Sequence, residues 1–155
     1  MSIPNPKIKL LIPTHKDFSP VELAEHILSV IYTEEARSIR DSVRELPESL
    51  RTIILIIDFD IELTMSGIVG FIGNSSGRYL NETIAALKLI KASEDLRIME
   101  EIRKRMDGQH FETIEKLAQG LYLYSEDRNI LDNLIRYLSD GWSIVSKELE
   151  EIRKI

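Results

Sequence analysis

The segment from Glu48 to Ser66 contains neither Gly nor Pro, and it limits the folds open to this chain more than any other. Its second half, from Ile57 to Thr64, alternates apolar and polar residues with the period of two that is typical of a strand. The uninterrupted segment is, however, longer than an ordinary strand and suits a buried helix better. We therefore predict a helix here.

Helix starts and apolar residues at helical spacing recur along the chain. Ser19-Pro20-Val21-Glu22 combines a capping Ser, a Pro at the first helical position and a Glu placed for a capping box. Thr33-Glu34-Glu35 predicts a second start, with a helix running to Leu46. Further helices are predicted over 81–91, 93–106 and 110–124. The glycines from Gly67 to Gly77 predict a tight turn between buried helices.

A regular apolar stripe follows Ser125-Glu126-Asp127, which predicts the cap of one long C-terminal helix. The stripe residues are three and four positions apart, the spacing of a heptad seam. They are Leu131, Ile135, Leu138, Trp142, Val145, Leu149 and Ile152. Two interpretations stay open: the helix docks on its own domain, or its end near Trp142 and Leu149 forms a homodimer interface.

These patterns predict an all-α protein, a compact single-domain bundle of about seven helices with a long C-terminal helix. Residues 1–17 hold three of the five prolines and are predicted to be an irregular arm, and residues 18–155 to be the helical domain. A length of 155 residues fits one domain.

The absence of Cys excludes disulfides and agrees with a reducing compartment. The longest apolar run, Ile53 to Ile57, is far shorter than a membrane span, and the first residues lack a signal-peptide pattern. We therefore expect a cytoplasmic protein without a membrane partner.

Negative charge is concentrated in the middle of the chain. The formal net charge is −6, and residues 58–127 hold 13 Asp and Glu against 8 Lys and Arg, or −5. Binding to nucleic acid needs clustered Lys and Arg, so direct binding of nucleic acid is not expected. A basic surface on another protein is the partner that this charge favours.

No catalytic constellation is present. The three His residues share no metal-ligand spacing, and neither a Cys nucleophile nor a Gly-x-Ser-x-Gly elbow occurs. We therefore predict no catalytic residue, no metal site and no cofactor.

An enzyme alternative is nevertheless open. Asp58, Asp60 and Glu62 would share a face on a strand and could bind a hard cation there, whereas on a helix only Asp58 and Glu62 share a face. The glycine loop could cradle phosphate, although it lacks the Gly-Lys-Ser/Thr ending of a P-loop. A small metal-dependent or nucleotide-handling enzyme would need these carboxylates to converge beside Asn74 and Ser75.

A spaced set of residues within 46–106 carries a family resemblance. The set is Asp60, Glu62, Gly67, Phe71, Asn74, Ser75, Ser76, Gly77 and Tyr79, followed by Glu82-Thr83 and Ala86-Leu87. It resembles the DNA-mimic protein family of bacteria, which is all-helical. Where that family has Asn-Gly-Gly, this chain has Met65-Ser66-Gly67, and Gly70 and Ile72-Gly73 replace its Gln and aromatic residues.

The resemblance implies a non-enzymatic, usually dimeric protein, and at least one member presents carboxylates like a DNA backbone to a DNA-binding protein. Such mimicry needs dense acid, because B-DNA carries one charge per about 1.7 Å of its axis. We therefore expect an interaction module that binds another protein, such as a basic DNA-binding one; an immunity-type protein that neutralises a toxin is a further alternative. The predicted partner surface consists of Glu94, Asp95, Glu100, Glu101, Glu112, Glu115, Glu126 and Asp127.

Overall fold

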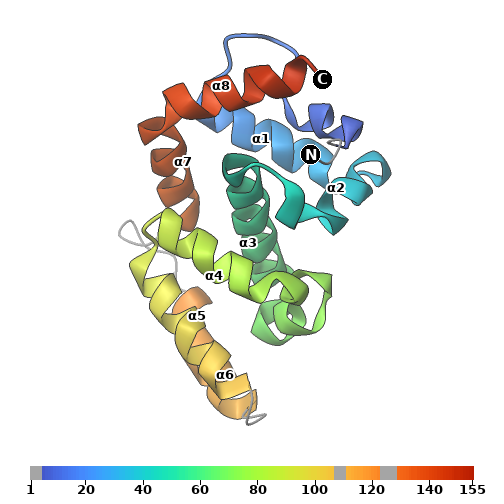
Figure 1. Cartoon of the computed structure of the whole chain (residues 1–155). Helices are drawn as coiled ribbons and strands as arrows, with labels where there is room; N and C mark the ends of the chain where they lie inside the picture. The colour runs from blue at the N-terminus through green and yellow to red at the C-terminus, as the bar shows by residue number, and fades with distance from the viewer. Residues whose placement is uncertain (1–4, 107–110, 123–128) are drawn as a thin grey trace. The chain divides into compact units, whose positions relative to one another are not determined.

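The computed structural model of the chain describes residues 5–106, 111–122 and 129–155, and every regular element in these ranges is a helix (Figure 1). The all-α prediction is therefore confirmed. None of the helices in these ranges has the length and apolarity needed to cross a membrane. The chain divides into two compact units: unit 1 is Met1–Ile54 with Ile135–Ile155, and unit 2 is Leu55–Leu134. That residues 18–155 form one domain stays a prediction.

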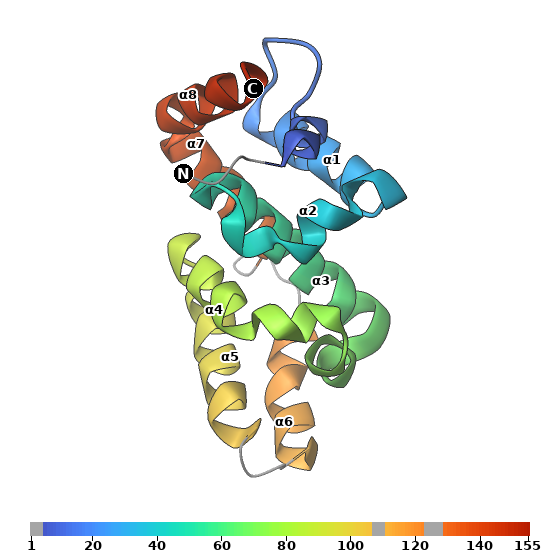
Figure 2. The ribbon, with the colours of Figure 1, turned by 45° about the vertical axis from the view of Figure 1, so that its right-hand side comes forward.

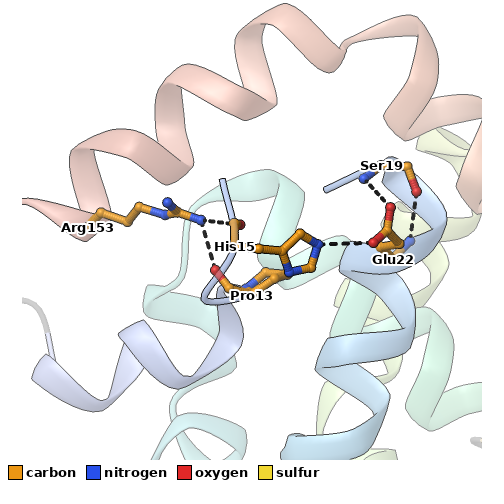
Figure 3. A network of polar contacts seen from close by, with 5 residues as sticks. All are labelled: Pro13, His15, Ser19, Glu22 and Arg153. Carbon is orange, nitrogen blue, oxygen red and sulfur yellow. Dashed lines mark hydrogen bonds and ion pairs between the residues drawn. The ribbon is translucent and has the colours of Figure 1, made fainter. Parts of the chain in front are cut away.

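Helix α1 of unit 1, Pro20–Ile31, begins where the capping signal predicts. The Ser19 Oγ accepts a hydrogen bond from the Glu22 N–H at 3.1 Å, and the Glu22 carboxylate accepts one from the Ser19 N–H at 3.1 Å. The His15 Nε2 lies 3.0 Å from the other Glu22 oxygen (Figure 3). The Ser19 backbone hydrogen bond, followed by the His15 contact, lowers the pKa of Glu22. One face of α1 is buried through Leu23 and Ile27.

The segment that precedes α1 is tied to the C-terminal helix α8, Trp142–Arg153. The Arg153 guanidinium donates hydrogen bonds to the Pro13 carbonyl at 2.8 Å and the His15 carbonyl at 3.1 Å (Figure 3). It also lies 5.5 Å from the centre of the Phe18 ring, and this ring packs edge-on against Trp142 at 5.8 Å. The side chains of α8 therefore hold the 13–18 segment in place.

The predicted irregular arm is partly helical. Residues Pro6–Leu11 form a 3-10 helix, η1, whose first turn is capped by Asn5, and it buries Ile8 and Leu11. The burial of these apolar side chains explains why residues 6–11 are ordered.

The helix predicted from Thr33 to Leu46 is not continuous, and that prediction was wrong. Three short pieces replace it: η2 (Glu34–Ala36), α2 (Arg37–Asp41) and η3 (Val43–Glu45). The Thr33 hydroxyl donates to the Val30 carbonyl at 2.6 Å and caps no N–H group of the next helix. The Ser42 hydroxyl likewise donates back to the Ser38 carbonyl, and Ser42 has non-helical dihedrals. Hydroxyl bonds to the preceding turn compete with helix propagation here.

Helix α3, Glu48–Gly73, confirms the helix predicted over the Gly- and Pro-free segment. Its range also takes in Gly67 to Gly73, the first part of the predicted turn, although two helices meet there at a kink. The helix is broken at Gly67, where φ is 68° and ψ is −175°. The turn itself comes later, at Asn74, and leads into η4, Ser75–Tyr79.

The C-terminal helix is present, but the predicted long helix is two consecutive helices. They are α7 (Ile130–Asp140) and α8, separated at Gly141, and residues 125–127 with the predicted cap lie outside the described part of the chain. Glycine favours the break because it costs about 1 kcal/mol within a helix relative to Ala. The seam residues Val145, Leu149 and Ile152 are buried in the folded chain. The docked interpretation of the stripe is therefore the one that the structure favours.

Unit 2 contains α4 (Leu80–Leu89), α5 (Ser93–Met106), α6 (Phe111–Ala118) and η5 (Gln119–Tyr122). Helices α5 and α6 lie side by side and run antiparallel, as Figure 2 shows. Their apolar faces are buried through Ile98, Met99, Ile102, Ile114 and Ala118. The outer faces of this hairpin carry most of the acids predicted to meet a partner.

Candidate protein-binding surface

The backbone at the break in α3 is held by Tyr122, a residue far along the chain. The Ile68 N–H donates a hydrogen bond of 2.9 Å to the Tyr122 hydroxyl oxygen. A Cβ at Gly67 would lie 3.2 Å from the same oxygen. The dihedrals of Gly67 fall in a region that is essentially restricted to glycine. Gly67 of the family motif therefore has a structural role: it lets the backbone bend at this point and leaves room for the Tyr122 hydroxyl.

The Asn-Ser-Ser-Gly element is the turn that follows α3. The Gly77 N–H donates to the Asn74 carbonyl at 3.0 Å. A Cβ at Gly77 would lie 2.2 Å from the Ile72 carbonyl oxygen, a distance that excludes any side chain. The side chains of Ser75 and Ser76 lie outside the described part of the structure.

The aromatic residues of the motif pack inside unit 2. Phe71 is buried and meets Phe59 edge-on at 5.2 Å between ring centres. Tyr79 is also buried, with the Arg78 guanidinium 4.7 Å from its ring centre. Edge-to-face pairs of this kind add about 0.5–1.5 kcal/mol beyond area burial. Phe71 thus stabilises α3 through its contact with Phe59.

The acids Asp58, Asp60 and Glu62 lie half-buried on α3. The helical period puts Asp58 and Glu62 one turn apart and points Asp60 to a different face. Glu62 accepts a hydrogen bond of 2.8 Å from the Asn74 amide. Over residues 5–106, 111–122 and 129–155, no group of three His, Cys, Asp or Glu could hold a metal ion. The convergence that the enzyme alternative requires is not found in these ranges.

The acids of α5 differ in their surroundings. Asp95 is only 3% exposed, so burial removes it from the surface on which it was expected. The Glu94 carboxylate pairs with Arg97, and the Glu101 carboxylate pairs with Lys104 at 3.3 Å. The Glu100 carboxylate makes no hydrogen bond or ion pair with a described residue. The outer face of α5 also carries Arg103 and Arg105 and is therefore mixed in charge rather than purely acidic.

The two acids of α6, Glu112 and Glu115, are less neutralised by neighbouring cations than the acids of α5. Glu112 is exposed and Glu115 half-exposed, and the carboxylates form no ion pair or hydrogen bond within the described chain. Residues three apart on a helix lie on adjoining positions of one face. Of the remaining predicted acids, Glu126 and Asp127 lie outside the described residues.

One family model, described as DMP19-like protein, matches residues 44–152. The chain belongs to the DMP19-like family. This family is named after DNA mimic protein 19, and the match confirms the resemblance that the α3 motif indicated. No curated protein and no solved structure matches the chain. The DMP19-like region includes every predicted acid and begins after α1.

Tyr122, which binds the backbone at the break in α3, has a structural role that the sequence did not reveal. It lies in η5, 54 residues from its hydrogen-bond partner Ile68, and no local pattern near Tyr122 marks it. A tyrosine hydroxyl can accept such a bond only where packing brings it to an unpaired backbone N–H.

Proposed function

We propose that this chain is a non-enzymatic interaction module of the DNA-mimic kind that binds a basic, DNA-binding protein in the cytoplasm. The observation that carries the proposal is the DMP19-like match over residues 44–152. The acid excess of the middle segment supports it, because a basic site that normally holds DNA attracts clustered carboxylates.

We place the centre of the surface on the α5–α6 hairpin, at Glu100, Glu112 and Glu115. Glu112 and Glu115 are about 4.5 Å apart along the α6 axis, from a rise of 1.5 Å per residue. Phosphates follow one another every 3.4 Å or so along a single strand of B-DNA. The spacing of this acid pair is therefore comparable to that of neighbouring phosphates. Glu94 and Glu101 would contribute after exchanging their own cations for those of the partner.

The test uses DNA as the competitor. The chain is immobilised, exposed to lysate of the source cell, and eluted either with salt or with double-stranded DNA. A DNA mimic occupies the DNA site of its partner, so double-stranded DNA should release the same proteins that salt releases, and these should bind DNA when isolated. Partners that resist both high salt and DNA would overturn the proposal.

A pair of charge-matched variants locates the surface. Glu112→Gln/Glu115→Gln removes two charges from α6, and Glu34→Gln/Glu35→Gln removes two exposed charges from unit 1. Both variants change the net charge from −6 to −4. The first should weaken capture about tenfold or more and the second little, since each lost ion pair with a partner contributes about 1 kcal/mol. Equal loss would show that only net charge matters and would remove the hairpin from the proposal.

A further inference from the structure

One side of α5 carries acids and bases in alternation. Glu94, Arg97, Glu101 and Lys104 are three, four and three positions apart, a spacing that places them in a row along the helix. The Arg97 guanidinium donates hydrogen bonds to the Glu94 carboxylate, and the Lys104 ammonium lies 3.3 Å from the Glu101 carboxylate. The row therefore consists of two ion pairs within one helix.

The two cations of this row are open to replacement from outside. The side chains of Arg97 and Lys104 are 61% and 72% exposed. The hydrogen bond and the charge of Glu94 raise the pKa of Arg97, and the charge of Glu101 adds to this effect. Arg97 is thus attracted by acids on both sides, although nothing buries it. A cation of another protein can take its place without unfolding α5.

We propose that Arg97 and Lys104 are internal counter-ions that compete with the cations of a partner for Glu94 and Glu101. This inference rests on the partner surface proposed above, to which these two acids belong. A partner has to break both ion pairs before it can use the two acids. The α5 surface therefore binds cations more weakly than its content of acids suggests.

This arrangement differs from that of DNA. The counter-ions of DNA are mobile, and their release into solution favours the binding of a basic protein. The two counter-ions of α5 are side chains, so a partner displaces them without releasing them. Loss of both should strengthen binding by about 2- to 30-fold, the range that two exposed ion pairs represent in a binding constant.

The direct test uses a fluorescently labelled oligolysine peptide, which is titrated with the purified chain at low salt and followed by anisotropy. The variant Arg97→Gln/Lys104→Gln should bind this peptide about 2- to 30-fold more tightly than the unaltered chain. Circular dichroism checks that the variant folds, as is expected for two exposed positions. A merely structural role of the two cations would not increase the affinity.

The matched control is Arg37→Gln/Lys154→Gln. It also breaks two exposed ion pairs between residues three apart, Glu34–Arg37 at 3.9 Å and Glu151–Lys154 at 3.2 Å. Each of the two double variants removes two positive charges and changes the net charge from −6 to −8. The pairs of the control lie in unit 1, outside the proposed surface, so the control should change binding little.

A quadruple variant shows whether the cations act through the two acids. Adding Glu94→Gln/Glu101→Gln to Arg97→Gln/Lys104→Gln restores the net charge of −6. The affinity should then return to that of the unaltered chain, because the acids that the first variant frees are absent.

Three results would overturn the inference: unchanged or weaker binding by Arg97→Gln/Lys104→Gln, an equal gain in the unit 1 control, and a gain that persists in the quadruple variant. The proposed function fails by a different result, namely that double-stranded DNA does not release the captured proteins. The peptide titration does not depend on that outcome, so the two failures are distinguishable.

Discussion

Replacing Gly67 with Ala tests whether the break in α3 is a built feature of unit 2. The φ of 68° and ψ of −175° at Gly67 lie in a region that costs a residue with a Cβ about 1–3 kcal/mol. The new Cβ would also lie 3.2 Å from the Tyr122 hydroxyl oxygen. Displacement of that oxygen weakens its hydrogen bond to the Ile68 N–H, which is worth about 0.5–1.5 kcal/mol. The expected loss of unfolding free energy is therefore about 1–4 kcal/mol.

Urea denaturation followed by circular dichroism measures this loss. With a denaturant slope of about 2 kcal/mol/M, a loss of about 2 kcal/mol lowers the midpoint by about 1 M. Gly73→Ala is the matched control, because Gly73 ends the same helix and a Cβ there meets nothing within 4 Å. At such a site Gly→Ala should stabilise by about 0.4–1 kcal/mol.

The two substitutions should thus have opposite signs. If Gly67→Ala is as stable as the unaltered chain, the backbone at residue 67 is not held in the glycine-only region and the reasoning fails. The double variant with Tyr122→Phe adds a further check. Its loss should be smaller than the sum of the two single losses, because Phe removes the oxygen that the new Cβ would meet.

The other predictions concern single contacts. Tyr122→Phe alone should cost about 1–3 kcal/mol in urea denaturation, because it leaves the part-buried Ile68 N–H without its acceptor. Ser19→Ala should lower the thermal midpoint through loss of the α1 cap, at about 0.5–2 kcal/mol, and an unchanged midpoint would contradict the capping box. The pKa of Glu22 is lowered in the folded state, so the Glu22 carboxylate stabilises the fold at pH values above its ordinary pKa of 4.5. This contribution disappears as the pH falls through the lowered pKa. The difference in unfolding free energy between the unaltered chain and Glu22→Gln should therefore shrink in acid. Trp142→Glu should destabilise unit 1 by removing the contact with Phe18, whereas a stable monomer replacing a dimer would place Trp142 at an interface between copies.

Much of the helical architecture is readable from local signals. Ser19-Pro20-Val21-Glu22 predicts the start of α1 because the capping groups lie within one turn of each other. The helix predicted over 93–106 has the bounds of α5, since its apolar period and its acidic first turn agree. The length of the Gly- and Pro-free segment likewise decided correctly against a strand at Asp58 to Glu62.

Local signals failed where a side chain had more than one possible partner. Thr33 resembles a cap for the next helix, yet its hydroxyl bonds to the preceding turn. The stripe from Leu131 to Ile152 has the period of one helix, but Gly141 divides it and the two halves pack as separate helices. In both cases the sequence allowed two conformations, and the pattern alone did not decide between them.

The candidate surface depended still more on the tertiary structure. The acid excess between Asp58 and Asp127 is a property of the sequence, because formal charges add regardless of fold. Whether an acid faces a partner depends on neighbours that only the folded chain supplies: Asp95 is buried, Glu94 meets Arg97, and Glu112 has no cation among the described residues.

Local patterns and composition are enough to predict the helical class and the sign of the charge, because these follow from hydrogen bonds and periods within a few residues and from summed formal charges. The family resemblance instead came from the spaced motif between Asp60 and Leu87. Only the folded chain reveals the break at Gly67 and its contact with Tyr122. These features depend on which distant surfaces pack together, and packing is a property of the whole chain that no local window contains.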